Sequence, residues 1–444
     1  MEKQKKATPW IAIITMFFMF AMISFVTNMA APFGNIWKNN YEWSGMLGNM
    51  MNFLAYLIMG IPAGKLMSRI GYKKTALIAL AVGFVGIVVQ YLSSLLGASV
   101  ATFSVGGQPV MLNFLIYLLG AFVCGFCVCM LNTVVNPMLN LLGEGGNRGN
   151  QLIQIGGTLN SLTGTLTPLL VGALIGQVTD RTAMSDVAPL LFIAMGVFAL
   201  AFFIILFVEI PEPRKLDGSE KSAGTEVRMA NGKKVSAWSF RHFVLGAVAI
   251  FFYVGVEVGI PAQLNFHLTE DPLCGAAIGG AVAAVYWLLM MVGRAASAAI
   301  SGKVSTRTQL ISVSSLAILL VVVAILMPND IRISMPGYSV ADGFSMFKVP
   351  VSSLFLVLCG LCTSLMWGGI FNLSVEGVGR YTEQASGIFM MMVVGGGIMP
   401  LIQYSIAGVV GFINSNWLVV AMLGYILFYA VAGSKNVNKD LPVD

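Results

Sequence analysis

The most regular feature of this chain is a series of long apolar runs separated by short polar segments. Runs of about 20 apolar residues are long enough to cross the hydrocarbon core of a bilayer as helices. The pattern therefore predicts an all-α membrane protein with twelve transmembrane helices in two six-helix bundles. The twelve runs lie near residues 10–34, 45–68, 75–96, 110–140, 151–178, 187–209, 242–268, 275–301, 308–327, 351–375, 385–410 and 414–433.

Polar residues divide the chain into two halves. Residues 210–240 are rich in Gly, Ser and charged side chains and are too short for a separate soluble domain. We therefore expect a bundle over residues 1–209, a cytoplasmic linker over 210–240 and a second bundle over 241–444. The loop 328–350 is the longest segment on the outer side. We expect it to fold over the outer mouth between the bundles.

The two halves repeat each other weakly. IPAGKLMSRIGYKKT after the second run resembles AISGKVSTRTQL after the eighth. Several runs are also interrupted by Gly, Pro and Asn, and internal repeats with broken helices are typical of secondary transporters. Pseudo-symmetry would then put matched residues in similar places. The alignment pairs Tyr56 with Arg294, Asn28 with Glu257, and Asn136 with Asn372.

Lys and Arg predict the orientation. With the N-terminus inside, 20 of them fall on cytoplasmic segments and four on outer segments, with Arg294 inside a span. Positive residues are enriched in cytoplasmic loops, so both termini are predicted to be cytoplasmic. The apolar run after MEKQKK is too long for a signal peptide core, and we expect it to remain as the first span.

Composition excludes most other classes of protein. The chain of 444 residues is 57% hydrophobic and only 10% charged, whereas soluble domains carry about 25% charged residues. The net charge of +6 follows the membrane topology and does not indicate a nucleic-acid partner. We expect a monomer in the plasma membrane or a bacterial inner membrane.

Enzyme and metal chemistry have no support in the residues. CGFC and CGLC lie in apolar runs, where thiols are expected to pack rather than to bind metal or form disulfides. No nucleophile–base pair, phosphate loop or metal-ligand spacing is visible. We therefore predict no catalytic activity, no cofactor and no metal site.

Two ionisable side chains lie well inside the predicted spans. Glu257 is in the middle of FVLGAVAIFFYVGVEVGIPAQLNF, and Arg294 is in the next span. A charge at the centre of a bilayer costs at least about 2.5–3.5 kcal/mol, so such residues are functional candidates. Glu257 and Arg294 are the candidates for cation coupling. The alternative for Glu257 is a structural role, and the alternative for Arg294 is a side chain that snorkels to the cytoplasm. Whether the two residues contact each other directly or through a substrate or water is left open.

The sequence GKLMSRIGYKK at residues 64–74 is a tight basic turn between the second and third spans. It resembles the signature loop of the major facilitator superfamily, although Ser68 stands near the usual acidic position. The resemblance implies a gating and structural role. It applies to Gly64, Arg69, Gly71 and Lys73.

A second resemblance covers most of the chain. MLNTVVNPMLNLLG, QLIQIGGTLNSLTGTLTPLL, YVGVEVGIPAQLNFHL and IFNLSVEGVGRYTEQASGIFMMMVVGGGIMPLIQ are similar to the fucose permease and glucose–galactose transporter branch of that superfamily. The resemblance implies sugar transport by alternating access, usually with a proton. Two positions depart from it: Asn28 and Asn132 stand where the fucose permeases carry an Asp and a Glu. An amide binds hydroxyls but cannot carry a proton.

Polar and aromatic side chains within apolar helices complete the candidate site. Amides can both donate to and accept from sugar hydroxyls, and the aromatic rings of Tyr56, Trp287 and Trp367 suit the apolar face of a pyranose. Each amide could instead serve interhelical hydrogen bonding. The substrate-binding candidates are Asn28, Asn132, Asn136, Gln154, Asn160, Glu257, Gln263, Asn265, Trp287 and Asn372.

The predicted function is monosaccharide transport across the cytoplasmic membrane. Coupling to a proton or sodium ion through Glu257 and uniport without coupling both remain open at this stage. The alternatives are a sugar-binding receptor on a transporter fold that signals through residues 210–240, and a transporter of a small solute that is not a sugar.

Overall fold

A computed structural model describes residues 10–41, 44, 47–175, 183–210, 235–339, 343–438 and 441. Most of the predicted linker, residues 211–234, lies outside the described residues, as does the tip of the loop 328–350. The described residues are mostly helical.

Six long helices make up the N-terminal half. Each follows one predicted apolar run, with ends that differ by a few residues. They are α1 (Trp10–Asn40), α2 (Leu47–Ile70), α3 (Tyr72–Leu95), α4 (Leu112–Leu142), α5 (Gly146–Ile175) and α6 (Ala188–Phe207).

The C-terminal half has three continuous long helices followed by three interrupted spans. A short 3-10 helix, η2 (Ala237–Ser239), precedes α8 (Arg241–Glu270), α9 (Gly275–Ile300) and α10 (Thr306–Leu326). The interrupted spans are built from α11 (Val351–Thr363), α12 (Met366–Val375), η3 (Gly379–Tyr381), α13 (Thr382–Met391), η4 (Met392–Val394), α14 (Gly395–Val410), η5 (Asn414–Asn416), α15 (Trp417–Phe428) and the π-helix η6 (Tyr429–Gly433).

Within the described residues, eleven helical segments are long and apolar enough to cross a membrane. The twelfth predicted span corresponds to α5, which is 30 residues long but carries many Asn, Gln, Ser and Thr side chains. These polar residues lower its hydropathy, although its length easily suffices for a bilayer. The prediction of a twelve-span helical membrane protein is therefore confirmed.

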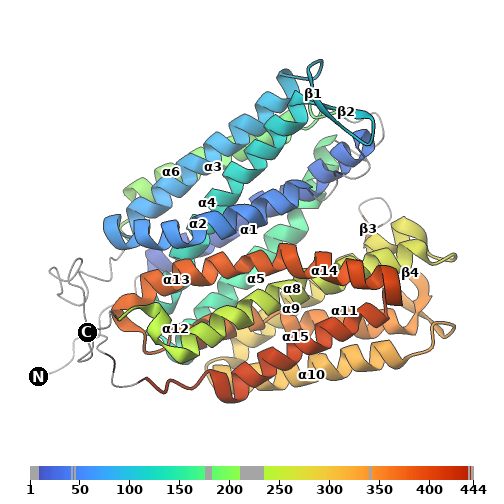
Figure 1. The fold of residues 1–444 in the computed structure, drawn as a ribbon. Coiled ribbons are helices and arrows are strands. Elements are labelled where there is room, and N and C mark those ends of the chain that lie inside the picture. Colours follow the sequence, from blue (N-terminus) through green and yellow to red (C-terminus); the bar gives the residue numbers. More distant parts are fainter. Residues whose placement is uncertain are drawn as a thin grey trace, which may run out of the picture.

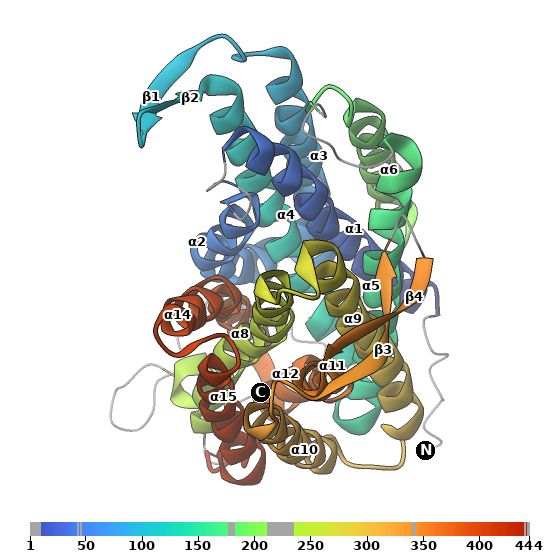
Figure 2. The same cartoon turned by 90° about the vertical axis from the view of Figure 1, so that its right-hand side faces the viewer.

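Two β-hairpins were not predicted. Strands β1 (Ala101–Val105) and β2 (Gln108–Met111) pair between α3 and α4, and β3 (Arg332–Ser339) pairs with β4 (Gly343–Pro350) between α10 and α11. The label all-α therefore holds for the spans but not for these two connections. The second hairpin forms the loop 328–350 and lies along α9, at one end of the helices (Figure 2).

The helices form two bundles, α1–α6 and α8–α15, that diverge toward one end and meet at the other (Figure 1). Both hairpins lie at the diverging end, which we call the hairpin end. The opposite end, where residue 210 leaves the first bundle and residue 235 enters the second, is called the linker end.

The linker end is closed by direct contact between α2 and α13. An added Cβ on Gly387 would lie 2.6 Å from the Gly60 carbonyl oxygen and 2.9 Å from the Gly64 Cα. Such distances leave no room for any side chain, so glycine is required for this approach of two backbones. Gly64 of the predicted gating loop thus belongs to the contact that closes the linker end.

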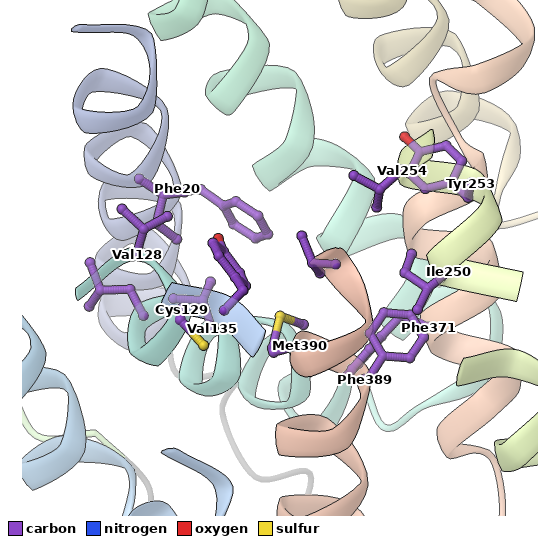
Figure 3. Packing of buried hydrophobic residues seen from close by; sticks show 14 of the residues in the cluster. Phe20, Val128, Cys129, Val135, Ile250, Tyr253, Val254, Phe371, Phe389 and Met390 are labelled. Carbon is purple, nitrogen blue, oxygen red and sulfur yellow. The ribbon is translucent and has the colours of Figure 1, made fainter. Parts of the chain in front are cut away.

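Apolar packing continues across the closed part of the interface. Figure 3 shows Met390 of α13 between Val135 of α4 and Phe389 of α13, with Phe371 beside it. All four side chains are at most 1% exposed and belong to one continuous hydrophobic core. The two bundles are therefore held together by burial as well as by polar contacts.

Cysteines contribute to packing, as expected from their apolar surroundings. Gly83 and Gly86 of α3 face Cys127 and Cys124 of α4, whose Sγ atoms lie 2.7 Å from where each glycine would carry a Cβ. The small residues let α3 and α4 pack closely along their length.

Candidate functional site

A cavity of about 1040 Å³ lies between the two bundles. It runs from the hairpin end, where Tyr338 and Phe344 of the second hairpin line it, to Gln154 and Arg294. Phe344 is 66% exposed, so the cavity meets solvent at the hairpin end. Beyond Gln154 the bundles are in direct contact, and the site is therefore accessible from one end.

Arg294 is the most highly connected side chain of the cavity. It extends from α9 and is only 9% exposed. Its Nε donates to the Ser364 carbonyl at 3.1 Å, and its Nη1 donates to the Gly157 carbonyl at 3.1 Å and the Ser161 hydroxyl at 2.7 Å. Gly157 and Ser161 belong to α5 of the other bundle, so this guanidinium joins the two halves.

Glu257 pairs directly with Arg294. The Arg294 Nη2 lies 3.1 Å from Glu257 Oε1, which also accepts a hydrogen bond from the Tyr253 hydroxyl at 2.9 Å. Among the described residues, Glu257 Oε2 accepts no hydrogen bond. Four of the five guanidinium N–H groups have partners, so one N–H remains. The pair thus keeps one acceptor and one donor for a ligand.

Direct pairing decides a question that the sequence left open. Distances along ideal helices put the two residues at depths that differ by roughly 12 Å. Transmembrane helices are tilted by about 20° on average, and the arginine side chain is long, so depth along straight axes is a poor guide. Arg294 does not snorkel to the linker end, because its hydrogen-bond partners all line or adjoin the cavity.

A break between α11 and α12 supplies backbone acceptors at the base of the cavity. Helix α11 ends at Thr363 and α12 begins at Met366. Interruption of a helix leaves carbonyl groups available to other partners. The Ser364 carbonyl binds Arg294, and the Leu365 carbonyl accepts a hydrogen bond from Gln154 Nε2 at 3.0 Å. Hence the interrupted span positions polar groups of both bundles.

Four predicted amides of the N-terminal bundle line the cavity: Gln154, described above, and Asn28, Asn132 and Asn160. Asn132 Nδ2 donates to the Tyr56 hydroxyl at 2.8 Å, Asn160 Nδ2 donates to the Phe20 carbonyl at 3.0 Å, and Asn28 Nδ2 donates to the Ser24 carbonyl at 2.8 Å. In each case the protein holds the side-chain nitrogen, and the Asn132 oxygen also accepts from Asn136 Nδ2 at 3.4 Å. The oxygens of Asn28 and Asn160 are the amide acceptors left for a ligand hydroxyl.

The predicted aromatic residues also lie at the cavity. Tyr56, Trp287 and Trp367 all line it, and Trp287 is 42% exposed. Trp367 is held by Asn136, whose side-chain oxygen accepts from its Nε1 at 3.2 Å. The cavity therefore combines charged, amide and aromatic groups, which suits a small molecule with several hydroxyls and an apolar face.

Four predicted amides lie outside the cavity lining, and we do not carry them into the site. Asn136 binds Trp367 on the linker side of the cavity. Asn372 donates to Asn140 and to the Gly146 carbonyl at the linker end. Gln263 donates to the Pro400 carbonyl between α8 and α14. Asn265 is likewise absent from the residues that line the cavity. Asn136, Asn372 and Gln263 thus bind residues of neighbouring helices.

The basic turn between α2 and α3 has structural contacts. Gly71 has a φ of 88° and caps α3, a conformation that glycine adopts without strain. Lys73 Nζ donates to the Leu206 carbonyl in the last turn of α6 at 2.9 Å, a favourable place for a cation. Arg69 is exposed. The basic turn is thus attached through Lys73 to the end of a neighbouring helix.

Several lining residues escaped sequence reasoning. Asn49, Asn52, Ser161 and Ser364 line the cavity but lie in segments where many small polar residues occur. Tyr253 does not line the cavity, but its hydrogen bond to Glu257 could have been predicted, because it precedes Glu257 by four residues and shares its helix face.

Matched residues of the two halves occupy matched environments. Asn28 and Glu257 both line the cavity, as do Tyr56 and Arg294. Asn136 and Asn372 both make contacts between the bundles on the linker side of the cavity. The weak sequence repeat therefore corresponds to a structural one.

Residues 10–401 match the Major Facilitator Superfamily. The chain belongs to this family. Membership accounts for the paired bundles and the central cavity, and it identifies the protein as a membrane transporter rather than an enzyme.

Curated relatives are similar along nearly their whole length. The chain is 29% identical over 430 residues to a glucose/galactose transporter of Brucella abortus, covering 96% of this chain and 94% of the relative. It is 28% identical over 445 residues to a putative glucose/galactose transporter of Helicobacter pylori, covering 98% and 99%.

Solved structures support the fold. A single-residue variant of the E. coli fucose:proton symporter FucP matches with a TM-score of 0.77 at 17% identity, covering 97% of this chain and all of that one. FucP in the outward conformation matches with a TM-score of 0.75, also at 17% identity, over 96% and 99% of the two chains. At such identities the likeness concerns fold alone.

Proposed function

We propose that this protein transports a monosaccharide across the cytoplasmic membrane by alternating access. One observation carries the proposal: the Glu257–Arg294 pair faces the cavity with one oxygen and one N–H left over. A sugar hydroxyl is both donor and acceptor and can satisfy both. The amides of Asn28, Asn132 and Asn160 surround the same space.

The two curated relatives add support for this substrate class, because both carry glucose/galactose names. Trp287 and Trp367 offer aromatic faces to the apolar side of a pyranose. Among the residues described at the cavity wall, one acidic and one basic side chain form a neutral pair, which favours an uncharged solute over an ion.

The proposed orientation follows from the distribution of Lys and Arg. Among the described residues, the connections at the linker end carry more Lys and Arg than those at the hairpin end, in keeping with a cytoplasmic side and cytoplasmic termini. On this orientation the hairpin end is outside, and the structure corresponds to an outward-facing state. We assign the protein to a bacterial inner membrane, since the relatives named above are bacterial.

Coupling is a separate part of the proposal, and we assign it to Glu257. Asn28 and Asn132 cannot exchange protons, and Glu257 is the carboxylate that lines the cavity. The positive charge of Arg294 favours the ionised form of Glu257, so binding of a proton or cation to Glu257 requires that the contact between the two side chains changes. Because Arg294 also holds Gly157 and Ser161, that change bears on the contact between the bundles.

Counterflow in proteoliposomes tests the proposal. Liposomes loaded with unlabelled D-glucose or D-galactose are diluted into trace labelled sugar, and transient accumulation of label is the expected result. A panel of other labelled sugars and small polar solutes extends the assay. Binding without counterflow would favour a receptor, and counterflow of another solute alone would replace the sugar.

A further inference from the structure

The hairpin β3–β4 places two aromatic side chains at the outer part of the cavity. Tyr338 and Phe344 are directly paired across the strands, with ring centroids 5.0 Å apart. Both line the central cavity, together with Gly280 and Ala281 of α9. Aromatic cross-strand pairs of this kind stabilise a hairpin and hold its surface in one arrangement.

The opposite face of the hairpin is fixed to the C-terminal bundle. Met335 is 3% exposed, and a Cβ on Gly337 would lie 3.1 Å from the Ala281 Cβ. Gly337 therefore lets the strand lie directly on α9. Val349, at 0% exposure, anchors the second strand where it enters α11.

An ion pair holds the base of the hairpin. Arg332 Nη2 donates to both carboxylate oxygens of Asp271, at 2.8 and 2.6 Å. Asp271 follows directly after α8, the helix that carries Glu257. Two hydrogen bonds from one guanidinium nitrogen restrict the orientation of the strand more than a single contact would. The aromatic pair is thus positioned by α8 and α9, both of which line the cavity.

We propose that Tyr338 and Phe344 form an outer sugar subsite that helps to determine substrate affinity and selectivity. This inference rests on the proposed function. Their rings offer apolar faces at the entrance, before the solute reaches Glu257 and Arg294. Phe344 is 66% exposed and, with the Tyr338 ring beside it, presents a continuous aromatic surface to the cavity.

Contact with the bilayer interface is the competing explanation for exposed aromatic residues. Met346 allows the two to be separated, because it lies on the same strand and face as Phe344 and is 65% exposed. It is absent from the residues that line the cavity. Met346→Ala is therefore the matched control.

The experiment compares uptake of labelled D-glucose and D-galactose by wild type, Tyr338→Ala, Phe344→Ala and Met346→Ala in proteoliposomes with equal amounts of protein. We expect each aromatic variant to raise KM roughly two- to tenfold with Vmax retained and the ratio of the two KM values altered. Tyr338→Phe should preserve KM, because the ring rather than the hydroxyl makes the contact. Met346→Ala should match wild type.

Two outcomes would overturn the outer subsite while leaving sugar transport intact. Unchanged KM in both aromatic variants would remove it, and equal effects of Met346→Ala and Phe344→Ala would favour contact with the bilayer. A wild type that transports neither sugar would instead overturn the proposed function, and the subsite with it.

Discussion

Arg294 of α9 lies 3.1 Å from Glu257 of α8 while also binding the Gly157 carbonyl and the Ser161 hydroxyl of α5. One side chain thus joins the acidic residue of the cavity to the opposite bundle. Removing one partner of a buried ion pair typically costs about 3–5 kcal/mol. Any event that changes the charge of Glu257 therefore bears on how the two bundles are held together.

The first prediction concerns coupling. A cation gradient drives transport only if a group binds the cation differently with and without substrate, and Glu257 is the carboxylate in the cavity. Glu257→Gln is expected to abolish uphill accumulation of sugar while exchange without a gradient continues. Uptake under imposed proton or sodium gradients, compared with counterflow, measures the two separately.

Wild-type behaviour provides the control for that prediction. If the wild type responds to neither gradient, the protein is a uniporter and Glu257 serves as a sugar ligand or structural group. If the wild type is coupled and Glu257→Gln still concentrates sugar, coupling resides elsewhere.

A second prediction concerns affinity. Asn132→Ala and Asn160→Ala each remove an amide that lines the cavity. Loss of a hydrogen bond costs about 0.5–1.5 kcal/mol, which corresponds to a roughly two- to tenfold weaker Kd. Equilibrium binding of labelled sugar to purified protein measures the change. Gln263→Ala is the comparison, since Gln263 lies outside the cavity lining and donates to the Pro400 carbonyl. Unchanged affinity in both cavity variants would move the site.

Topology gives a third prediction. Ser305 and Ser334 are both exposed, the first before α10 and the second on β3. In a background with Cys274→Ser, Ser305→Cys should react with a membrane-impermeant thiol reagent only from the cytoplasmic side. Ser334→Cys should react only from outside. The reverse pattern in intact cells and inverted vesicles would invert the proposed orientation.

The spans and the two charged residues within them were predictable because their signals are local, whereas the pairing of Glu257 with Arg294 was left open. A run of 20 apolar residues has few alternatives to a transmembrane helix, and Glu257 and Arg294 stand out within such runs. The loop 328–350 was correctly expected at the mouth, because Tyr338 and Phe344 line the cavity. Its strands were not predicted, because the sequence of this loop shows no clear alternation of polar and apolar residues.

Amide roles were harder to predict, because they depend on how the helices are rotated and on the state of the transporter. Asn132 and Asn136 are one turn apart on α4, yet Asn132 lines the cavity and Asn136 binds Trp367. Backbone groups were missed entirely: the Ser364 carbonyl accepts from Arg294 at the break between α11 and α12, and the Leu365 carbonyl accepts from Gln154 in addition to the Gly369 N–H. No side-chain pattern in the sequence reports such acceptors.

The fourth prediction concerns pH and the hairpin anchor. Burial raises the pKa of Asp271, but hydrogen bonds from the Leu273 backbone N–H and the Arg332 side chain outweigh it, and the net pKa is below its ordinary value. A depressed carboxyl pKa gives stabilisation that is complete above the ordinary value and lost only as pH falls through the lower, folded one. The anchor should therefore be intact at about pH 5 and above.

Asp271→Asn is accordingly expected to raise KM for sugar by a constant factor between about pH 5 and pH 8. The shape of the pH profile should match that of the wild type. A difference that grows or shrinks across this range would contradict a permanently ionised Asp271.

The last prediction concerns the glycine contact between α2 and α13. A side chain at position 387 would collide with Gly60 and Gly64 backbone atoms, the nearest at 2.6 Å. Gly387→Val should therefore prevent closure of the linker end and reduce the outward-facing population. A cysteine at Asn49, which lines the cavity near the hairpin end, would report this as slower labelling from outside. Gly408→Val in α14 is the matched control, because nothing lies within 4 Å of an added Cβ there. Equal labelling rates in the two variants would mean that this contact does not control the conformational equilibrium, whereas slower labelling in Gly387→Val alone would identify the α2–α13 contact as the closure of the linker end.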